Sequence, residues 1–473
     1  MFKPLHRRRI IMGLNVTVHG SEQLNYFIYS FEMLFCEKRF SMLPLLQSLN
    51  RFLWNGPMLF LLMGTHIFFT FRLGFVQKKV FRGIRYSFTP ETDASKDFSA
   101  FSALSTTLAA TLGTGNIVGI STAIALGGPG AVFWCWLTGI LGMATSYAEC
   151  YLSVLFRQKD KEGNYFGGPM YVLEHGLGSR ILGIFYALCT VLASFGVGCI
   201  TQSNAITETA YHLWHLSPSL VSVVVAILIG MVLIGGTIMI QKVCQGLVPC
   251  VSIFYIGSCI FLLIKNYNYI SAAFTWIFTN AFSTQSFVGG ISGGGLMLAT
   301  RYGIARGLFT NEAGIGSAGI AAATSSNKNP LRQALVSMTA TFWDTVVMCL
   351  ITALVILTHL LRYPDSATNS SITGLTTIAF SVLPYGEILL GLSLIAFALA
   401  TLIGWSYFGK SAVSYLFPKN SRKIYESVYL VMIFLGGIAS LRYVWEMADL
   451  LNAFMVIPNL IALFCLKDKI QKP

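Results

Sequence analysis

The sequence predicts an all-α polytopic membrane protein, a bundle of helices built from two repeats. Of the 473 residues, 55% are hydrophobic and only 11% are charged, whereas soluble domains carry about 25% charged residues. The apolar residues fall in runs long enough to cross a bilayer, which takes about 20 residues per helix. Glycine-rich stretches interrupt two of these runs, 98–126 and 272–300, one in each half of the chain.

The apolar runs predict about eleven spanning helices at this length per helix. They lie near 52–71, 98–126, 130–156, 181–211, 219–240, 243–264, 272–300, 334–361, 385–416, 424–441 and 447–466. We treat the first as an extra N-terminal helix, because the others then divide into five plus five with a broken helix opening each half. Such paired interruptions are typical of secondary transporters with inverted repeats. One transmembrane domain, 42–473, would contain repeat one at about 98–264 and repeat two at about 272–466.

The first interruption is Gly113-Thr114-Gly115-Asn116, and the second is the glycine-rich segment 289–295. Glycine lowers the cost of leaving the helical conformation. Unwinding at bilayer depth frees backbone carbonyl and amide groups, which must be satisfied by protein, water, ion or substrate. A broken helix is therefore a candidate binding site, although glycine-mediated close packing of helices is the alternative.

Basic residues alternate between the two sides of the predicted bundle. One set of connections contains most of them, including Arg82, Arg157, Arg301, Arg306, Lys410 and Lys467. The opposite set contains only Lys265, Arg362 and Arg442. Because Lys and Arg accumulate on the cytoplasmic side, this predicts a multi-pass protein of the plasma (inner) membrane with a cytoplasmic C-terminus.

Residues 1–41 do not fit this topology. Their basic residues, such as Arg7 and Lys38, would lie on the outer side, and the segment has no uninterrupted apolar core like that of a signal peptide. Met42 directly precedes the apolar run of the first helix. We expect that the natural start is Met42, and a genuine amphipathic extension on the membrane surface is the alternative.

Several segments resemble the alanine or glycine:cation symporter family. They are ALSTTLAATLGTGNIVGISTAIALGGPGAVFWCWLTGILGMATSYAECYLSVLFR (103–157), LNRFLWNGPMLFLLMGTHIFFTFRLGFVQ (49–77), GGPMYVLE (167–174), ATRYGIARGLFTNEAGIGSA (299–318) and GWSYFGKSAVSYLF (404–417). The resemblance covers nearly everything after residue 42. It implies a leucine-transporter-type fold and the import of alanine or glycine, D-alanine included, with sodium or occasionally with protons.

The chemistry of a zwitterionic amino acid suits the first break. The positive N-terminal end of a half-helix can meet the carboxylate, and broken-helix carbonyls can hold the ammonium and sodium. We therefore expect Thr114, Gly115 and Asn116 to line the substrate site, with Thr114 and Asn116 also serving sodium. Thr401 is expected to offer its hydroxyl to sodium or substrate, unless it bonds to its own helix.

The resemblance adds three further substrate residues. Trp405, four positions after Thr401, matches a tryptophan that faces the first broken helix, with an interfacial belt position as the alternative. Gln202 lies in a Gln-Ser-Asn run of the family and would contact substrate, unless it only bonds helices together. Ile291 replaces an aromatic residue of the family and would change the side-chain pocket. A second departure is Lys410, where the family usually has Glu.

Charged residues near the spans are candidates for gating. Asp344 lies ten residues into the run 334–361, and a structural carboxylate is as good an interpretation as a gate. Arg306 and Glu312 follow the second broken helix and would form an inner gate, unless they only pair in a loop. Glu149 is expected near an inner helix end, solvated or paired with Arg.

Other functional classes find little support. The seven histidines are dispersed, and no HExxH, GxSxG, CxxC or P-loop pattern occurs, which argues against a membrane enzyme. A channel would need a filter and usually oligomeric symmetry. We expect a monomeric carrier without a cofactor, whose partners are a small amino acid, sodium as the coupling ion and the lipid bilayer, with no nucleic acid.

Overall fold

The computed structural model describes residues 43–54, 56–89, 99–159, 164–283, 295–367, 374–418, 420–438 and 442–473. The expected extension over 1–41 lies outside the described residues. So do Ile291 and all but the last residue of the predicted second interruption. Residues 49–473 form one compact unit.

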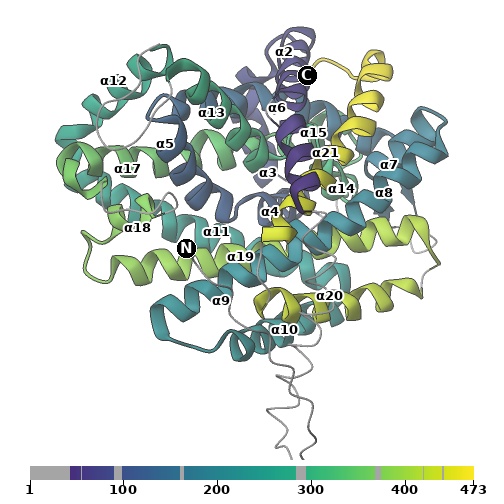
Figure 1. The fold of residues 1–473 in the computed structure, drawn as a ribbon. Coiled ribbons are helices and arrows are strands. Elements are labelled where there is room, and N and C mark those ends of the chain that lie inside the picture. The colour runs from purple at the N-terminus through teal and green to yellow at the C-terminus, as the bar shows by residue number, and fades with distance from the viewer. Residues whose placement is uncertain are drawn as a thin grey trace, which may run out of the picture. The chain divides into compact units, whose positions relative to one another are not determined.

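Helices make up nearly all of this unit (Figure 1). Its first half contains α2 (Pro57–Arg72), α3 (Val80–Phe88), α4 (Ala100–Thr111), α5 (Ile120–Gly127), α6 (Ala131–Leu155), α7 (Pro169–Tyr171), α8 (Arg180–Phe195), α9 (Thr201–Trp214), α10 (Pro218–Ile234) and α11 (Gly236–Lys265). The second half contains α12 (Ile270–Ala281), α13 (Gly295–Asn311), α14 (Ser317–Ala323), α15 (Pro330–Ser337), α16 (Thr339–Thr341), α17 (Leu350–Arg362), α18 (Leu375–Phe380), α19 (Gly386–Leu416), α20 (Ser421–Ile438) and α21 (Arg442–Cys465). A two-stranded antiparallel hairpin, β1 (Gln158–Lys159) and β2 (Tyr165–Phe166), follows α6.

Six described helical segments are long and apolar enough to cross a membrane. They are Leu43–Arg72, Ala131–Leu155, Arg180–Trp214, Gly236–Lys265, Pro330–Arg362 and Gly386–Leu416. The pair α4 and α5 is bent by 53° and makes a seventh span if counted as one. The predicted broken helix at 98–126 is thereby confirmed, whereas the count of eleven stays a prediction.

One helix boundary was predicted wrongly because a buried glutamine was taken for a connection. The turn between α10 and α11 lies at Gly235–Gly236, where Gly236 has a positive φ of 68°, and not at 241–242. Gln241 is buried within α11. Its amide oxygen accepts from the Ser102 hydroxyl of α4 at 3.1 Å, and its amide nitrogen donates to Thr324 Oγ1 at 3.2 Å.

Helix α13 continues to Asn311, well past the predicted end at residue 300. It runs beside α6 because glycines allow close contact. Gly303 lies against the Ala131 carbonyl and Gly307 against Thr138, and Gly319 of α14 follows against Ser153. Residues 298–323 therefore pass along the whole length of α6 in the same direction.

This path corrects the expected positions of Arg301 and Arg306. Both lie in α13 beside the first half of α6, and not in the basic connection at its far end. At that far end, Arg157 donates to the carbonyls of Ser325 at 2.6 Å and Asn327 at 2.8 Å. The two arginines therefore do not contribute to the charge bias of that side.

A second helix break lies between α13 and α14. It contains three residues with positive φ, namely Glu312 at 52°, Gly314 at 98° and Gly316 at 91°. Two glycines take this left-handed conformation without a steric penalty, whereas it is uncommon for glutamate. The sequence analysis did not predict this interruption, because its glycines are isolated rather than clustered.

Candidate substrate and ion site

The first break is held open by its own asparagine. Helix α4 ends at Thr111, and a π-helical turn, Gly115–Gly119, leads into α5. The Gly113 amide donates to Asn116 Oδ1 at 3.0 Å, which satisfies one backbone group that the unwinding has freed. Such π-helical turns occur frequently at functional sites.

Asn116 is bonded within the protein on both sides of its amide. Its Nδ2 donates to Asp344 Oδ1 at 2.7 Å and to the Asp344 carbonyl at 3.1 Å. The Thr345 hydroxyl donates to Asp344 Oδ2 at 2.7 Å. Both Asn116 and Asp344 are buried. The pair therefore ties the first break to the π-helical stretch Phe342–Cys349.

The backbone of the second break is held in the same way. The Ala313 amide donates to Asn311 Oδ1 at 3.0 Å, and the Tyr186 hydroxyl donates to the Ile315 carbonyl at 3.0 Å. Asn459 donates to the Gly314 carbonyl at 2.9 Å. With these groups satisfied, the break is a fixed feature of the fold.

Glu149 supports this break from α6. Asn459 Nδ2 also donates to Glu149 Oε1 at 2.6 Å, and the backbone amides of Gly314 and Gly316 face the carboxylate. The side chain is 2% exposed. The expected solvated or Arg-paired position was wrong, because an unwound segment supplies the hydrogen-bond partners that water or arginine would otherwise provide.

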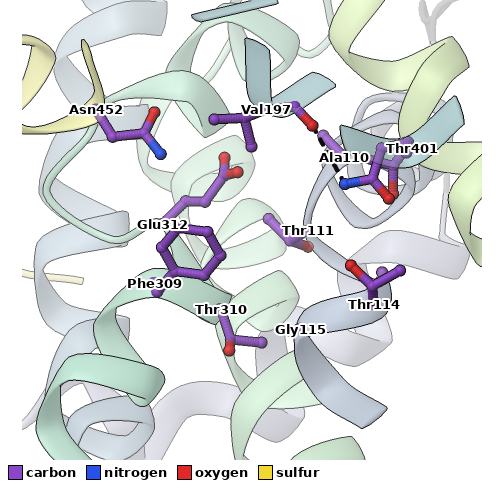
Figure 2. Close-up of a pocket in the computed structure, with 12 residues that line it drawn as sticks. Ala110, Thr111, Thr114, Gly115, Val197, Phe309, Thr310, Glu312, Thr401 and Asn452 are labelled. Carbon is purple, nitrogen blue, oxygen red and sulfur yellow. Dashed lines mark hydrogen bonds between the residues drawn. The ribbon is translucent and has the colours of Figure 1, made fainter. Parts of the chain in front are cut away.

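A small, partly enclosed cavity lies where the two breaks face each other (Figure 2). Its volume is about 30 Å³. At about 10–15 Å³ per water molecule, the cavity has room for two or three waters. Its walls are formed by Ala110, Thr111, Gly113, Thr114, Gly115, Val197, Gln202, Phe309, Thr310, Glu312, Thr401 and Asn452. Figure 2 shows Thr114 and Thr401 on one side and Glu312 and Asn452 on the other.

The polar groups of the cavity come from separate helices. Glu312 Oε2 accepts from the Ser317 hydroxyl at 2.6 Å. Gln202 donates to the Val197 carbonyl at 3.2 Å, whereas its Oε1 has no hydrogen-bond partner among the described residues. The same is true of Asn452 Oδ1. Buried acceptors without partners are costly, so this set of atoms points to a polar ligand.

Thr401 approaches the first break from α19. Its hydroxyl donates to the Phe397 carbonyl at 3.0 Å, and the Leu112 carbonyl lies 3.5 Å away. A Cβ on Gly113 would lie 3.1 Å from the same hydroxyl. The hydroxyl and this carbonyl are hard oxygen ligands of the kind that suit small cations. Within the described residues, no group of three or more His, Cys, Asp or Glu side chains could hold a metal ion.

Trp405 lies behind the cavity wall rather than in it. The indole packs directly on Gly198 and makes an edge contact with Phe408 at 5.6 Å between ring centroids. It is fully buried, so it is not an interfacial belt residue. Its Nε1 lies close enough to the Glu312 carboxylate to interact with it, although without a hydrogen bond of normal geometry.

The structure thus brings five of the predicted residues to one cavity: Thr114, Gly115, Gln202, Thr401 and Glu312. Asn116, Asp344 and Trp405 lie behind its walls, and Arg306 lies one helical turn before Thr310. Sequence reasoning missed Phe309, Thr310, Asn452 and Val197 as lining residues. Only the break at Glu312, with its Asn-Glu-Ala-Gly run, carried a local signal that could have found the first two.

Comparison with known proteins agrees with this architecture. Residues 40–472 match the model of the sodium:alanine symporter family. The sodium/alanine symporter AgcS of Methanococcus maripaludis is 42% identical over 431 residues, 89% of this chain and 94% of that one. An uncharacterized transporter of Haemophilus influenzae is 39% identical over 90% of this chain and 94% of its own.

The fold also occurs among solved structures. A sodium-coupled sialic acid symporter in its outward-open state matches with a TM-score of 0.50 and 13% identity, over 86% of this chain and 85% of that one. This likeness shows a leucine-transporter-like helical fold. The protein is a multi-pass membrane transporter and not an enzyme. By its sequence, the chain belongs to the sodium:alanine symporter family, a family of cation-coupled amino-acid symporters.

Proposed function

We propose that this protein imports glycine, L-alanine or D-alanine together with sodium, by alternating access. The observation that carries the proposal is the small cavity of about 30 Å³ between the two helix breaks, with acceptors in its wall that have no partner among the described residues. A larger side chain than a methyl group would need the walls to move. The relative named a sodium/alanine symporter supports the same substrate. The carrier is proposed to work as a monomer.

The two charged ends of the substrate fit opposite sides of this cavity. The carboxylate would face Thr114 and Gly115, where a helix begins and its dipole favours an anion. The ammonium would face the Glu312 carboxylate and the free oxygen of Gln202. A charge-assisted hydrogen bond to a carboxylate is among the strongest available in a site closed to water. In this proposal Glu312 binds substrate and does not form an inner gate.

Sodium would sit between Thr401 and the carbonyls of the first break, near Leu112 and Thr114. Asn116 was expected to be a further ligand. Because its oxygen already accepts from Gly113, we propose instead that it positions the break. Asp344, its partner, would act with it rather than as an independent gate.

Arg306 would close the cavity on one side. It lies one turn before Thr310, and Asp449 lies one turn before Asn452, so each precedes a cavity residue on its own helix. The two side chains interact electrostatically. Given the path of α13 beside α6, this lid would be at the outer side. The second broken span would then be 295–323 rather than 272–300, and the C-terminus would be in the cytoplasm of a plasma-membrane protein.

Proton coupling is the second candidate. Three buried carboxylates, Glu149, Glu312 and Asp344, form no ion pair within the described part of the chain. Each bonds to an amide or a hydroxyl instead. A protonated carboxyl is compatible with such partners.

The test is uptake of labelled glycine and of L- and D-alanine into proteoliposomes under an imposed sodium or proton gradient. We expect saturable uptake that depends on the sodium gradient and persists when the proton gradient is collapsed. Uptake driven by protons alone would establish the second candidate, and non-saturable flux would establish a channel.

A further inference from the structure

A second, larger cavity lies further along α19. It has a volume of about 630 Å³ and is lined by parts of the β1–β2 hairpin, the α10–α11 turn, α19 and the start of α20. Thr401 belongs to the central cavity, whereas Ser411 and Ser414 belong to this one. Ten residues of helix separate Thr401 from Ser411, a rise of about 15 Å. The two cavities are therefore separate sites, arranged in sequence along one helix.

The charged residues that line the second cavity within the described chain are all basic. Lys410 and Arg422 both line it, and no Asp or Glu is among its lining residues within the described chain. Lys410 pairs with Glu426, and both side chains are largely buried. Arg422 Nε donates to Ser414 Oγ at 2.6 Å, and no hydrogen bond of its two terminal nitrogens is seen among the described residues.

Further groups around Arg422 are compatible with an anion. It interacts electrostatically with the hydroxyls of Tyr171 and Tyr407, which both line the cavity. Glu174 interacts with Tyr171 and lies 3.9 Å from the exposed Arg180. Among the described lining residues, the positive charge without an acidic partner is therefore that of Arg422.

Two helices begin at this cavity. Gly235, Gly236, Thr237 and Ile238, at the start of the 30-residue helix α11, all line it, and no side chain caps this helix start. Helix α20 begins at Ser421, directly before Arg422. The first amide groups of a helix lack partners within it, and the helix dipole favours an anion there. The uncapped start of α11 and a guanidinium are elements of a phosphate site.

We propose that this cavity binds a phosphate group, either free in solution or in the headgroup of an anionic lipid. Its volume lies within the range of about 300–1,000 Å³ that ligand pockets occupy. The cavity does not suit the transported amino acid, because it offers no free carboxylate to an ammonium. Thr324, which accepts from Gln241, also lines it. Occupancy would therefore hold α11, α19 and the residue that follows α14 together and stabilise the arrangement of this end.

Thermal unfolding of the purified full-length protein in a neutral detergent tests the proposal. One arm adds potassium phosphate against potassium chloride at equal ionic strength. The other adds dioleoylphosphatidylglycerol against dioleoylphosphatidylcholine. We expect a saturable rise of the unfolding midpoint in one arm, which identifies the source of the phosphate.

Arg422→Gln should raise the half-saturating concentration about tenfold, as expected for the loss of one charge-assisted contact. Lys423→Gln is the matched control, because Lys423 is the next residue, is exposed and does not line the cavity. It should behave like the wild type. Ser411→Phe fills the cavity without removing a charge and should abolish the rise of the unfolding midpoint. This variant tests the proposal if Arg422→Gln does not fold.

No rise with either ligand in the wild type would overturn the proposal. So would an equal rise in Arg422→Gln and Lys423→Gln, or an undiminished rise in Ser411→Phe. Because binding is measured without transport, these outcomes do not depend on which amino acid the protein carries.

Discussion

Glu312 combines three features that rarely occur at one residue. It has a left-handed backbone conformation with φ of 52°, it is 6% exposed, and its carboxylate lines the central cavity. Such a conformation costs about 1–3 kcal/mol in a residue other than glycine and persists where the surroundings enforce it. Here Ser317 and the turn at Gly314 hold the side chain toward the cavity. The fold thus places a carboxylate in the cavity despite the cost to stability, and a carboxylate there is well suited to bind the ammonium group of a substrate.

Glu312→Gln should therefore weaken substrate binding. Replacing the charged acceptor with a neutral one of the same shape removes the charge-assisted part of the contact, so we expect the half-saturating alanine concentration to rise about 10- to 100-fold. The measurement is sodium-driven uptake in proteoliposomes at saturating sodium. Glu208→Gln, at an exposed site on α9, is the control. A half-saturating alanine concentration unchanged in Glu312→Gln would exclude the ammonium contact.

Thr401→Ala should act on sodium rather than on the maximal rate. The variant removes one oxygen that faces the Leu112 carbonyl, and a contact of this size corresponds to about a 2- to 10-fold rise in half-saturating sodium. Thr401→Ser keeps the oxygen and should stay close to wild type. If the alanine and serine variants show the same sodium dependence, the hydroxyl only bonds to its own helix.

Much of the central cavity could be predicted at the residue scale. Thr114 and Gly115 stand out because Gly113 and Gly115 interrupt an apolar run. Thr401 was expected from its hydroxyl in an apolar helix, and Gln202 followed from the family resemblance. Asn452 could not be found in this way. It is a single polar residue of α21, and only the tertiary packing of that helix brings it to the cavity.

At the scale of elements, the central site is made of interruptions. The Gly115–Gly119 turn, the Gly196–Ile200 turn and the 312–316 break interrupt three different spans, and all three contribute to the cavity wall. The α helices then serve as supports that hold these interruptions in register. Asn116 and Asp344 form the bond that fixes the first interruption to a fourth span.

Asn116→Ala should destabilise the fold. The Gly113 amide and the Asp344 carboxylate would each lose a buried partner, which costs about 1–3 kcal/mol per group. We expect a lower thermal unfolding midpoint and slower transport. Asn280→Ala, whose side chain bonds only within α12, is the control. Equal midpoints for the two variants would mean that the first break does not need this tie.

Element boundaries could be predicted where glycine or proline marks them. The prediction failed where a buried polar residue was taken for part of a connection. Pro218 and Gly386 mark helix starts close to the expected ones. At α11 the polar residues Gln241 and Lys242 suggested a connection, although the Gly235–Gly236 pair makes the turn. A buried glutamine with two partners cannot be told from a solvated one by composition.

For the molecule as a whole, the parallel course of α13–α14 and α6 sets the topology of the second half. The sequence analysis placed residues 301–333 at the basic side, because arginine was taken to mark a connection. In the structure two of those arginines lie along a helix within the bundle. Charge counting cannot detect this, because it assumes that a charged residue is outside the span.

Single cysteines introduced at Met297 and Lys328 should react with a membrane-impermeant thiol reagent from opposite sides of the membrane. Both positions are exposed, and they lie at the two ends of the path beside α6. Labelling in right-side-out and inverted vesicles makes the measurement, with the parent protein as control for its own cysteines. Reaction of both from the same side would restore the topology expected from the charges.

The bridge made by Gln241 affects how this end of the bundle comes apart. One amide holds both Ser102 of α4 and Thr324, directly after α14. Pulling one helix away turns the amide and spoils its geometry toward the other. The Gln241 side chain thus links residues 102 and 324, which belong to the two halves of the sequence. Movement of either partner therefore strains the bond to the other, which couples the two segments to each other.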